Sequence, residues 1–146
     1  MDEQFQKYLR TIGMGEVLQN RVEEILQIFA TSFETEIKDI FVSEYVDSEN
    51  KRVFENLWLL NSEFIMESKE FVSDYDFDFI RLKNNVVYLQ IKKTSFDFKE
   101  PTNNSRLNLH LRFTDSLIGD FKASRENCTQ LMYILKKYIQ PNLSTT

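Results

Sequence analysis

The sequence has little of the residue types from which most catalytic and metal sites are built. Its 146 residues include one cysteine, one histidine and three glycines. A single cysteine excludes an intrachain disulfide, a single histidine excludes a histidine-rich metal cage, and three scattered glycines cannot form a phosphate-binding loop. The motifs G-x-S-x-G, H-E-x-x-H and C-x-x-C are also absent. We therefore expect a protein that is not an enzyme, with no catalytic, cofactor-binding or metal-ligating residues and no cofactor.

A basic excess and a long apolar run are missing as well. The chain carries 18 Lys and Arg against 23 Asp and Glu, a net charge of −5, whereas general nucleic-acid binders need cations to neutralise phosphates. No window approaches the roughly eighteen apolar residues of a membrane span, and the N-terminus lacks a basic segment followed by an apolar run. Nucleic-acid binding, a transmembrane segment and a secretory signal are therefore unexpected. A lone cysteine suits a reducing compartment, so the expected location is the cytoplasm.

Apolar and aromatic residues are abundant. Apolar residues make up 42% of the chain, with thirteen Phe, six Tyr and one Trp, so we expect one folded domain with Trp58 in its core. The N-terminal pattern favours two amphipathic helices, at about 2–12 and 15–31. The second contains an apolar stripe at helical spacing, formed by Leu18, Val22, Ile25 and Phe29 and widened by Val17.

From residue 37 onward the pattern changes to alternating and β-branched runs, which are typical of strands. Turn-forming residues separate these runs, which lie at about 40–46, 52–60, 63–67, 74–82, 86–93, 106–113 and 117–122. A final helix is expected at about 125–139, with Ser124 as its N-cap because a serine hydroxyl can accept from a first-turn N–H. The predicted fold class is α+β, with N-terminal helices, about seven antiparallel strands in a sheet or partial barrel, and a C-terminal capping helix.

This order of elements resembles the pleckstrin-homology-like (PH-like) fold. Segments 57–65, 79–86 and 121–139 are similar to the strands, turns and closing helix of its small bacterial members. The resemblance implies a helical extension at 1–36, a PH-like domain at 37–140 and a tail at 141–146. Phosphoinositide-binding members carry a basic cluster at the first hairpin. Here that hairpin has only Lys51 and Arg52, beside Asp47 and Glu49, which argues against lipid headgroup binding.

An alternating run of acidic and aromatic residues is the sharpest local pattern. Asp74, Asp76 and Asp78 alternate with Tyr75, Phe77 and Phe79, which are expected to be buried. An EF-hand would need Gly at the sixth and Glu at the twelfth position, where this sequence has Phe79 and Asn85. The three aspartates are therefore interpreted as the solvated face of a strand or as an acidic patch for a protein partner, and a metal site is the least favoured reading.

Basic residues gather on both sides of the loop that contains Pro101. Lys92, Lys93, Lys99 and Arg106 form the most basic neighbourhood and are the candidate anion-binding residues. The net negative charge favours a different interpretation, an edge strand whose lysines prevent unwanted pairing. Both interpretations stay open.

Cys128 and His110 are the one Cys–His pair available for nucleophilic catalysis. The first turn of a helix can lower the pKa of a thiol. However, Cys128 lies on the apolar stripe of the last helix, and a buried cysteine behaves as a small hydrophobic residue. His110 alternates with leucines and is expected to face solvent. A catalytic pair is therefore not expected.

Three functions from different classes stay open. The favoured one is a non-catalytic binding or assembly module that takes a protein or peptide at an exposed sheet edge, or forms a homo-oligomer through its N-terminal helices. The second is an acidic protein that neutralises a basic partner, of the immunity-protein or secretion-chaperone kind, through Asp74, Asp76 and Asp78. The third is a small enzyme with an NTF2-like pocket, which a C-terminal capping helix disfavours.

Overall fold

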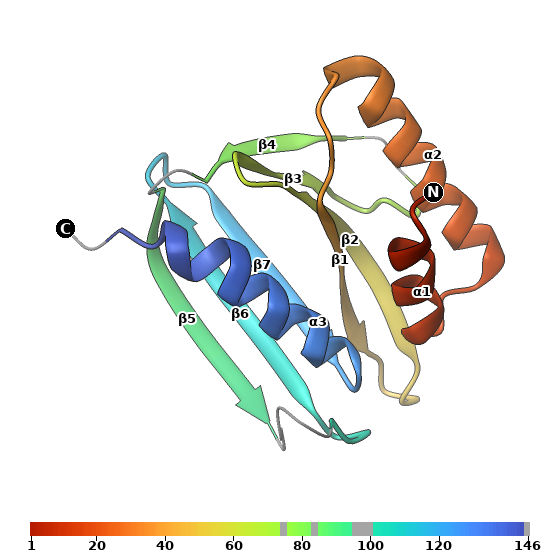
Figure 1. Ribbon diagram of the computed structural model, residues 1–146. Helices are drawn as coiled ribbons and strands as arrows, with labels where there is room; N and C mark the ends of the chain where they lie inside the picture. The colour runs from red at the N-terminus through yellow and green to blue at the C-terminus, as the bar shows by residue number, and fades with distance from the viewer. Residues whose placement is uncertain (74–75, 83–84, 95–100, 145–146) are drawn as a thin grey trace.

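The part of the chain that the structure describes folds into two N-terminal helices, seven strands and a C-terminal helix. A computed structural model describes residues 1–73, 76–82, 85–94 and 101–144. In chain order the elements are α1 (Glu3–Thr11), α2 (Glu16–Phe33), β1 (Asp39–Val46), β2 (Arg52–Leu60), β3 (Phe64–Ser68), β4 (Asp78–Arg81), β5 (Val86–Thr94), β6 (Arg106–Phe113), β7 (Ile118–Ser124) and α3 (Asn127–Ile134). A π-helical turn (Leu135–Ile139) and a 3-10 turn (Gln140–Asn142) follow α3. The predicted α+β fold class is confirmed (Figure 1).

The strands form two antiparallel sheets rather than one closed barrel. Sheet A has the strand order β1-β2-β3-β4, and sheet B has the order β5-β6-β7. Side chains bridge the sheets where β1 meets β7. Ser43 Oγ accepts a hydrogen bond from the Lys122 N–H (3.0 Å), and Glu44 Oε1 accepts one from the Ser124 N–H (3.1 Å). This arrangement leaves β4 and β5 as the outer strands of the two sheets.

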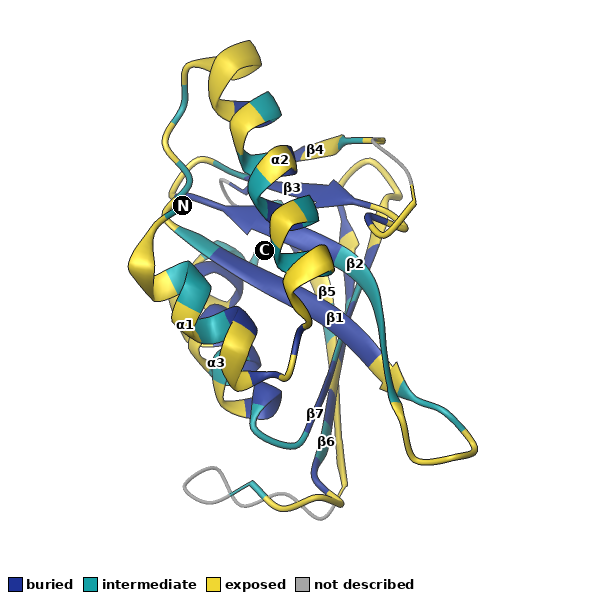
Figure 2. Ribbon diagram, turned by 90° about the vertical axis from the view of Figure 1, so that its right-hand side faces the viewer, coloured by how far each residue is buried: buried dark blue, intermediate teal, exposed yellow. Residues whose placement is uncertain are grey.

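The N-terminal helices share a hydrophobic core with one face of sheet A. The residues buried there are Leu9, Val22, Ile25 and Phe29 from the helices and Ile40, Val42, Leu57, Leu59 and Met66 from the sheet. Figure 2 shows the exposed side of α2 turned away from the sheet. The segment 1–36 therefore packs on the sheet. The prediction that Val17 widens the buried stripe was wrong: its side chain is 83% exposed, because it points about 100° away from Leu18 around the helix.

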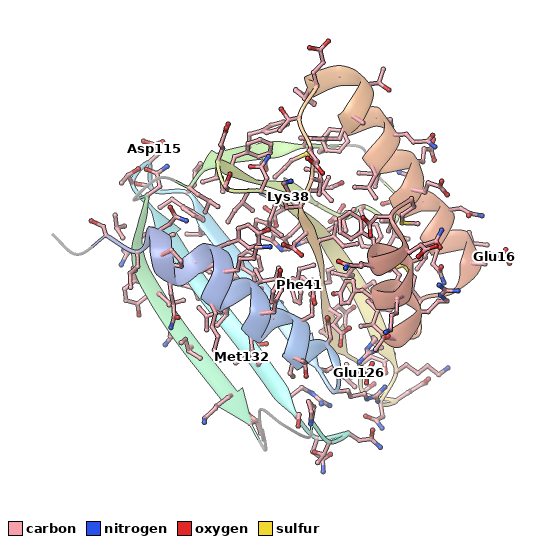
Figure 3. All side chains as sticks on the ribbon, in the orientation of Figure 1. Glu16, Lys38, Phe41, Asp115, Glu126 and Met132 are labelled. Atoms are coloured by element: carbon pink, nitrogen blue, oxygen red, sulfur yellow. The ribbon has the colours of Figure 1, made fainter. Side chains whose placement is uncertain are left out.

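A second core fills the space between α3 and the two sheets. Its members include Phe41 and Trp58 from sheet A, Leu107, Leu109, Leu111 and Phe121 from sheet B, and Cys128, Leu131 and Leu135 from the C-terminal helix. Phe41 lies between α3 and sheet A (Figure 3). Trp58 stacks on Phe121 with ring centroids 4.1 Å apart, so its predicted place in the core is confirmed. A Cβ on Gly119 would lie 3.3 Å from the Trp58 ring, which explains a glycine within β7.

A buried ion pair joins α1 to β1, β2 and the start of α3. Arg52 Nε lies 2.9 Å from Glu44 Oε1, and the guanidinium also reaches Glu126 (2.6 Å), the Ser124 carbonyl (3.1 Å) and the Ile12 carbonyl at the end of α1. Burial raises the pKa of Glu44, while hydrogen bonds from Ser124 and the charge of Arg52 oppose that rise. Removal of Arg52 would leave the buried Glu44 carboxylate without this counter-ion, whereas removal of Glu44 would leave the guanidinium paired with Glu126.

Side chains satisfy the edge of β1 that faces α1 and α3. The Tyr8 hydroxyl accepts a hydrogen bond from the Val42 N–H (2.9 Å) and donates one to Asn127 Oδ1 (2.6 Å). The Asn127 amide donates to the Val42 carbonyl (2.9 Å), and the Gln130 amide donates to the Ile40 carbonyl (2.9 Å). These contacts occupy backbone groups that could otherwise pair with another strand.

Tertiary contacts move the ends of two predicted elements. Ser124 is the last residue of β7 instead of an N-cap, because its hydroxyl donates to the buried Glu44 carboxylate, and α3 begins at Asn127. β4 covers Asp78–Arg81 instead of 74–82, and residues 74–75 of the predicted strand lie outside the described residues. Local propensity alone does not decide such boundaries.

Candidate functional site

Sheet B has one face covered by α3 and one face that no described helix covers. Figure 1 shows α3 along the covered face. In β6 the leucines point to the core, so Asn108, His110 and Arg112 point the other way. The register places Gln90 and Asp120 beside His110, and Lys92 and Lys122 beside Asn108. We call this surface the open face of sheet B; it comprises Tyr88, Gln90, Lys92, Asn108, His110, Arg112, Ile118, Asp120 and Lys122.

A shallow hollow of about 290 Å³ lies on the open face of sheet B. It is lined by Gln90, Lys92, Asn108, Leu109, His110, Asp120 and Lys122. The two lysines come from the flanking strands β5 and β7, and the Asn108 amide lies between them in the register. The hollow therefore combines two cationic groups with amide groups that can both donate and accept hydrogen bonds.

Two of the basic side chains on this face are already engaged by carboxylates. His110 is hydrogen-bonded through Nδ1 to the Asp120 carboxylate (2.6 Å), and Lys122 Nζ lies 3.5 Å from Glu55 Oε1. Within the described residues, Lys92 and Arg112 form no ion pair, and the Arg112 guanidinium lies 4.9 Å from the centre of the Tyr88 ring. A chain of net charge −5 thus presents two cations here that have no carboxylate partner in the part of the chain that the structure describes.

β5 is the exposed outer strand of sheet B. It pairs with β6 along one edge. The described residues bridge its other edge at Val86, which pairs with Leu143 and accepts a hydrogen bond from the Ser144 N–H (2.7 Å). The side chains of Val87, Tyr88 and Ile91 are 46%, 41% and 47% exposed. Ile91 lies beside Leu109 and shares its face, so its exposure shows that β5 extends past the core.

The predicted basic neighbourhood is divided by the alternation of β5. Lys92 lies on the open face of sheet B, whereas Lys93 pairs with Leu107 and lies on the opposite face. Arg106 turns back to donate to the carbonyls of residues 103 (2.9 Å) and 105 (2.8 Å). Lys99 lies outside the described residues. The structure instead brings Lys92 to the same hollow as Lys122, which the sequence analysis did not select.

The predicted acidic run lies at the outer strand of sheet A. Asp76 and Asp78 are exposed, Asp78 forms an ion pair with Lys69 (3.3 Å), and Asp74 lies outside the described residues. Of the aromatic residues between them, Phe77 is half-buried and Tyr75 lies outside the described residues. Phe79 is 42% exposed, contrary to prediction, because it points to the α2 side of this outer strand and contacts Phe33 at the end of that helix, whereas Ile80 points into the core on the opposite face.

Phe79 and Phe33 form an exposed aromatic pair at the same edge. Their ring centroids are 4.8 Å apart, and Phe33 at the end of α2 is 46% exposed. Phe29 and Phe64 pack behind them, with centroids 6.0 Å and 5.8 Å from that of Phe79. Aromatic side chains that remain half-exposed are suited to contact with a partner protein.

Glu67 carries a buried carboxyl group on β3. Its side chain accepts a hydrogen bond from the Asn56 amide (3.2 Å), and the residue is 5% exposed. Burial raises the pKa of Glu67 to about 7, the charge of Lys69 opposes the rise, and the charges of Asp78 and Asp120 add to it. In the sequence Glu67 is one of several carboxylates that could take part in acid–base chemistry, and nothing distinguishes it from the others, because the pattern of β3 alone does not show which face the neighbouring sheet covers.

Cys128 and His110 lie on opposite sides of sheet B. Cys128 is buried in the core, and burial raises the pKa of its thiol to about 12. His110 lies on the open face of sheet B, bonded to Asp120. The structure therefore does not bring the two together, and Cys128 is a poor nucleophile at neutral pH.

No group of three or more His, Cys, Asp and Glu residues is placed to hold a metal ion in the part of the chain that the structure describes. None of the described helices is long and apolar enough to cross a membrane. Comparisons with protein-family models, curated proteins and solved structures gave no match.

Proposed function

We propose that the protein is a non-catalytic binding module with a PH-like fold, and that it takes a strand of a protein partner at the outer edge of β5. The order of seven antiparallel strands in two sheets followed by a C-terminal helix supports the PH-like assignment. The buried Cys128, with its raised thiol pKa, and its separation from His110 support a role in binding instead of catalysis.

The observation that carries the proposal is the difference between two strand edges. Tyr8, Asn127 and Gln130 occupy the backbone groups on the edge of β1. The described residues bridge the outer edge of β5 at Val86, and the strand continues for eight residues beyond that point with mostly exposed side chains. An exposed edge of this length can accept a peptide as an additional strand, with backbone hydrogen bonds supplying affinity and alternate side chains supplying specificity.

Selection of peptides on the immobilised full chain tests this proposal. A random dodecamer library is selected against the wild-type protein, and the affinity of the selected peptides is measured by fluorescence anisotropy. We expect the I91K variant to bind them at least about tenfold more weakly, because it places a charge on the exposed apolar side of β5. The matched control is V17K, which changes an exposed valine on α2. Equal binding by wild type and I91K would refute the site.

The second candidate function is neutralisation of a basic partner. The outer strand of sheet A favours it, because this strand carries the exposed Phe79 of the aromatic pair on one face and the exposed Asp78 on the other, and a cationic protein surface can contact aromatic anchors while carboxylates attract it. If a basic protein is encoded beside this one, calorimetry of the two proteins at low and high salt tests the idea. The D74N/D76N/D78N variant should lose most of the salt-sensitive affinity, while exposed D115N should not. An unchanged affinity of the triple variant would contradict a role for these three aspartates in binding the partner.

A further inference from the structure

The two sides of β5 offer different chemistry to a strand that pairs with it. Successive side chains of a strand point to opposite faces. Gln90 and Lys92 therefore lie on the open face of sheet B, whereas Leu89 and Ile91 share the face of the core residues of β6. A strand added at this edge alternates in the same way, and its side chains lie about 5 Å from those directly opposite on β5.

The open-face side of this edge favours acidic residues in the partner. Lys92 has no ion pair among the described residues, and it shares its hollow with Lys122. The open face of sheet B carries three Lys and Arg side chains and one Asp, although the net charge of the chain is −5. A carboxylate opposite Lys92 would gain attraction that an uncharged residue lacks, and a lysine there would be repelled.

The opposite side of this edge favours apolar residues. Ile91 is 47% exposed, and Leu89 is half-buried at the margin of the core. An apolar side chain opposite Ile91 would remove both groups from water and extend the core past β6. A polar residue at that position would leave the isoleucine exposed.

We infer that the strand bound at β5 alternates acidic and apolar residues, with its acidic side chains on the open face of sheet B beside Lys92 and its apolar side chains over Ile91. This inference rests on the proposed function and names the chemistry of the partner. A second copy of the chain is a poorer occupant, because pairing of two β5 strands would place the Lys92 side chains of both copies along one edge. Lys92 thus opposes a basic edge and favours an acidic one.

Three synthetic octapeptides test the inference on the full chain. They alternate Val with Glu, Ser or Lys, and binding is followed by the backbone amide signals of the 15N-labelled protein. We expect the Glu peptide to shift the signals of β5 and to bind at least about tenfold more tightly than the Ser peptide, with no binding of the Lys peptide. The affinity of the Glu peptide should fall as salt is raised from about 50 to 500 mM.

A charge reversal at Lys92 tests whether this lysine selects the acidic peptide. The K92E variant should lose the preference for the Glu peptide and gain binding of the Lys peptide, whereas K136E changes an exposed lysine next to α3 and should behave as wild type. Equal affinity of the Glu and Ser peptides at β5 would overturn the inference and leave the proposed function standing. Failure of every peptide to shift the signals of β5 would count against both. Concentration-dependent shifts of β5 without peptide would identify a second copy as the occupant and overturn the inference.

Discussion

Glu67 should make the protein less stable as the pH rises from about 4.5 to 7. Its carboxyl is 5% exposed, and burial raises its pKa from 4.5 to about 7. Because the folded-state pKa lies above the unfolded-state value, the folded protein binds more protons than the unfolded protein between these two pH values. The stabilising contribution of the protonated carboxyl is therefore complete below pH 4.5 and is lost as the pH rises through about 7.

The size of the effect follows from the same two pKa values. A difference of 2.5 between 4.5 and 7, at about 1.4 kcal/mol for each pH unit, corresponds to about 3 kcal/mol of unfolding free energy. The E67Q substitution removes the ionisable group while its amide oxygen can still accept the hydrogen bond from Asn56. At pH 8 the variant should therefore be more stable than wild type by up to about 3 kcal/mol, and near pH 4.5 this advantage should vanish.

Urea denaturation of wild type and E67Q at intervals between pH 4.5 and 8 measures this difference. The two proteins are compared by the difference between their unfolding free energies at each pH, because the other carboxyl groups titrate equally in both. D115N, in an exposed turn, serves as the control and should follow the wild-type curve. The prediction would be refuted if the difference in unfolding free energy between wild type and E67Q stayed constant within about 0.5 kcal/mol across this range. That result would show that Glu67 ionises in the folded protein as it does in the unfolded chain.

Three further predictions address the core and the edge of β1. I25D should lower the unfolding free energy by more than about 3 kcal/mol, whereas V17D on the exposed side of the same helix should change it by less than about 0.5 kcal/mol; equal effects in thermal melts would contradict the packing of α2 on sheet A. Y8F should cost about 1–3 kcal/mol in urea denaturation, because the Val42 N–H loses its acceptor, and a neutral result would contradict the role of Tyr8 at this edge. The thiol of Cys128 should react with iodoacetamide far more slowly in the native protein at pH 8 than in about 6 M urea, because burial raises its pKa to about 12; equal rates would contradict its burial.

The sequence predicted the fold best where periodicity and turn residues agree. The strands expected at 52–60 and 106–113 match β2 and β6, since both have regular alternation or apolar runs between polar turns. The α2 stripe was also predicted correctly at Val22, Ile25 and Phe29. Such patterns are local, and the core faces of these elements follow from them without knowledge of the neighbouring elements.

The candidate site was predicted only in part, because it depends on register and on faces. Neighbouring lysines such as Lys92 and Lys93 look like one cluster in the sequence but lie on opposite faces of β5. Lys122 enters the hollow only through the pairing of β6 with β7, which the sequence does not specify. The buried Glu44–Arg52 pair was missed for a related reason, since charged residues near a turn are usually exposed.

Amide hydrogen exchange of the full chain with the Glu–Val octapeptide determines whether a strand adds to β5. If a strand adds to β5, amides within residues 87–94 should exchange more slowly when the peptide is bound, because new backbone hydrogen bonds protect them. Amides on the edge of β1, such as that of Val42, already have side-chain partners and should not change. Protection of β4 alone, or no protection of either β4 or β5, would contradict the assignment of β5 as the binding edge.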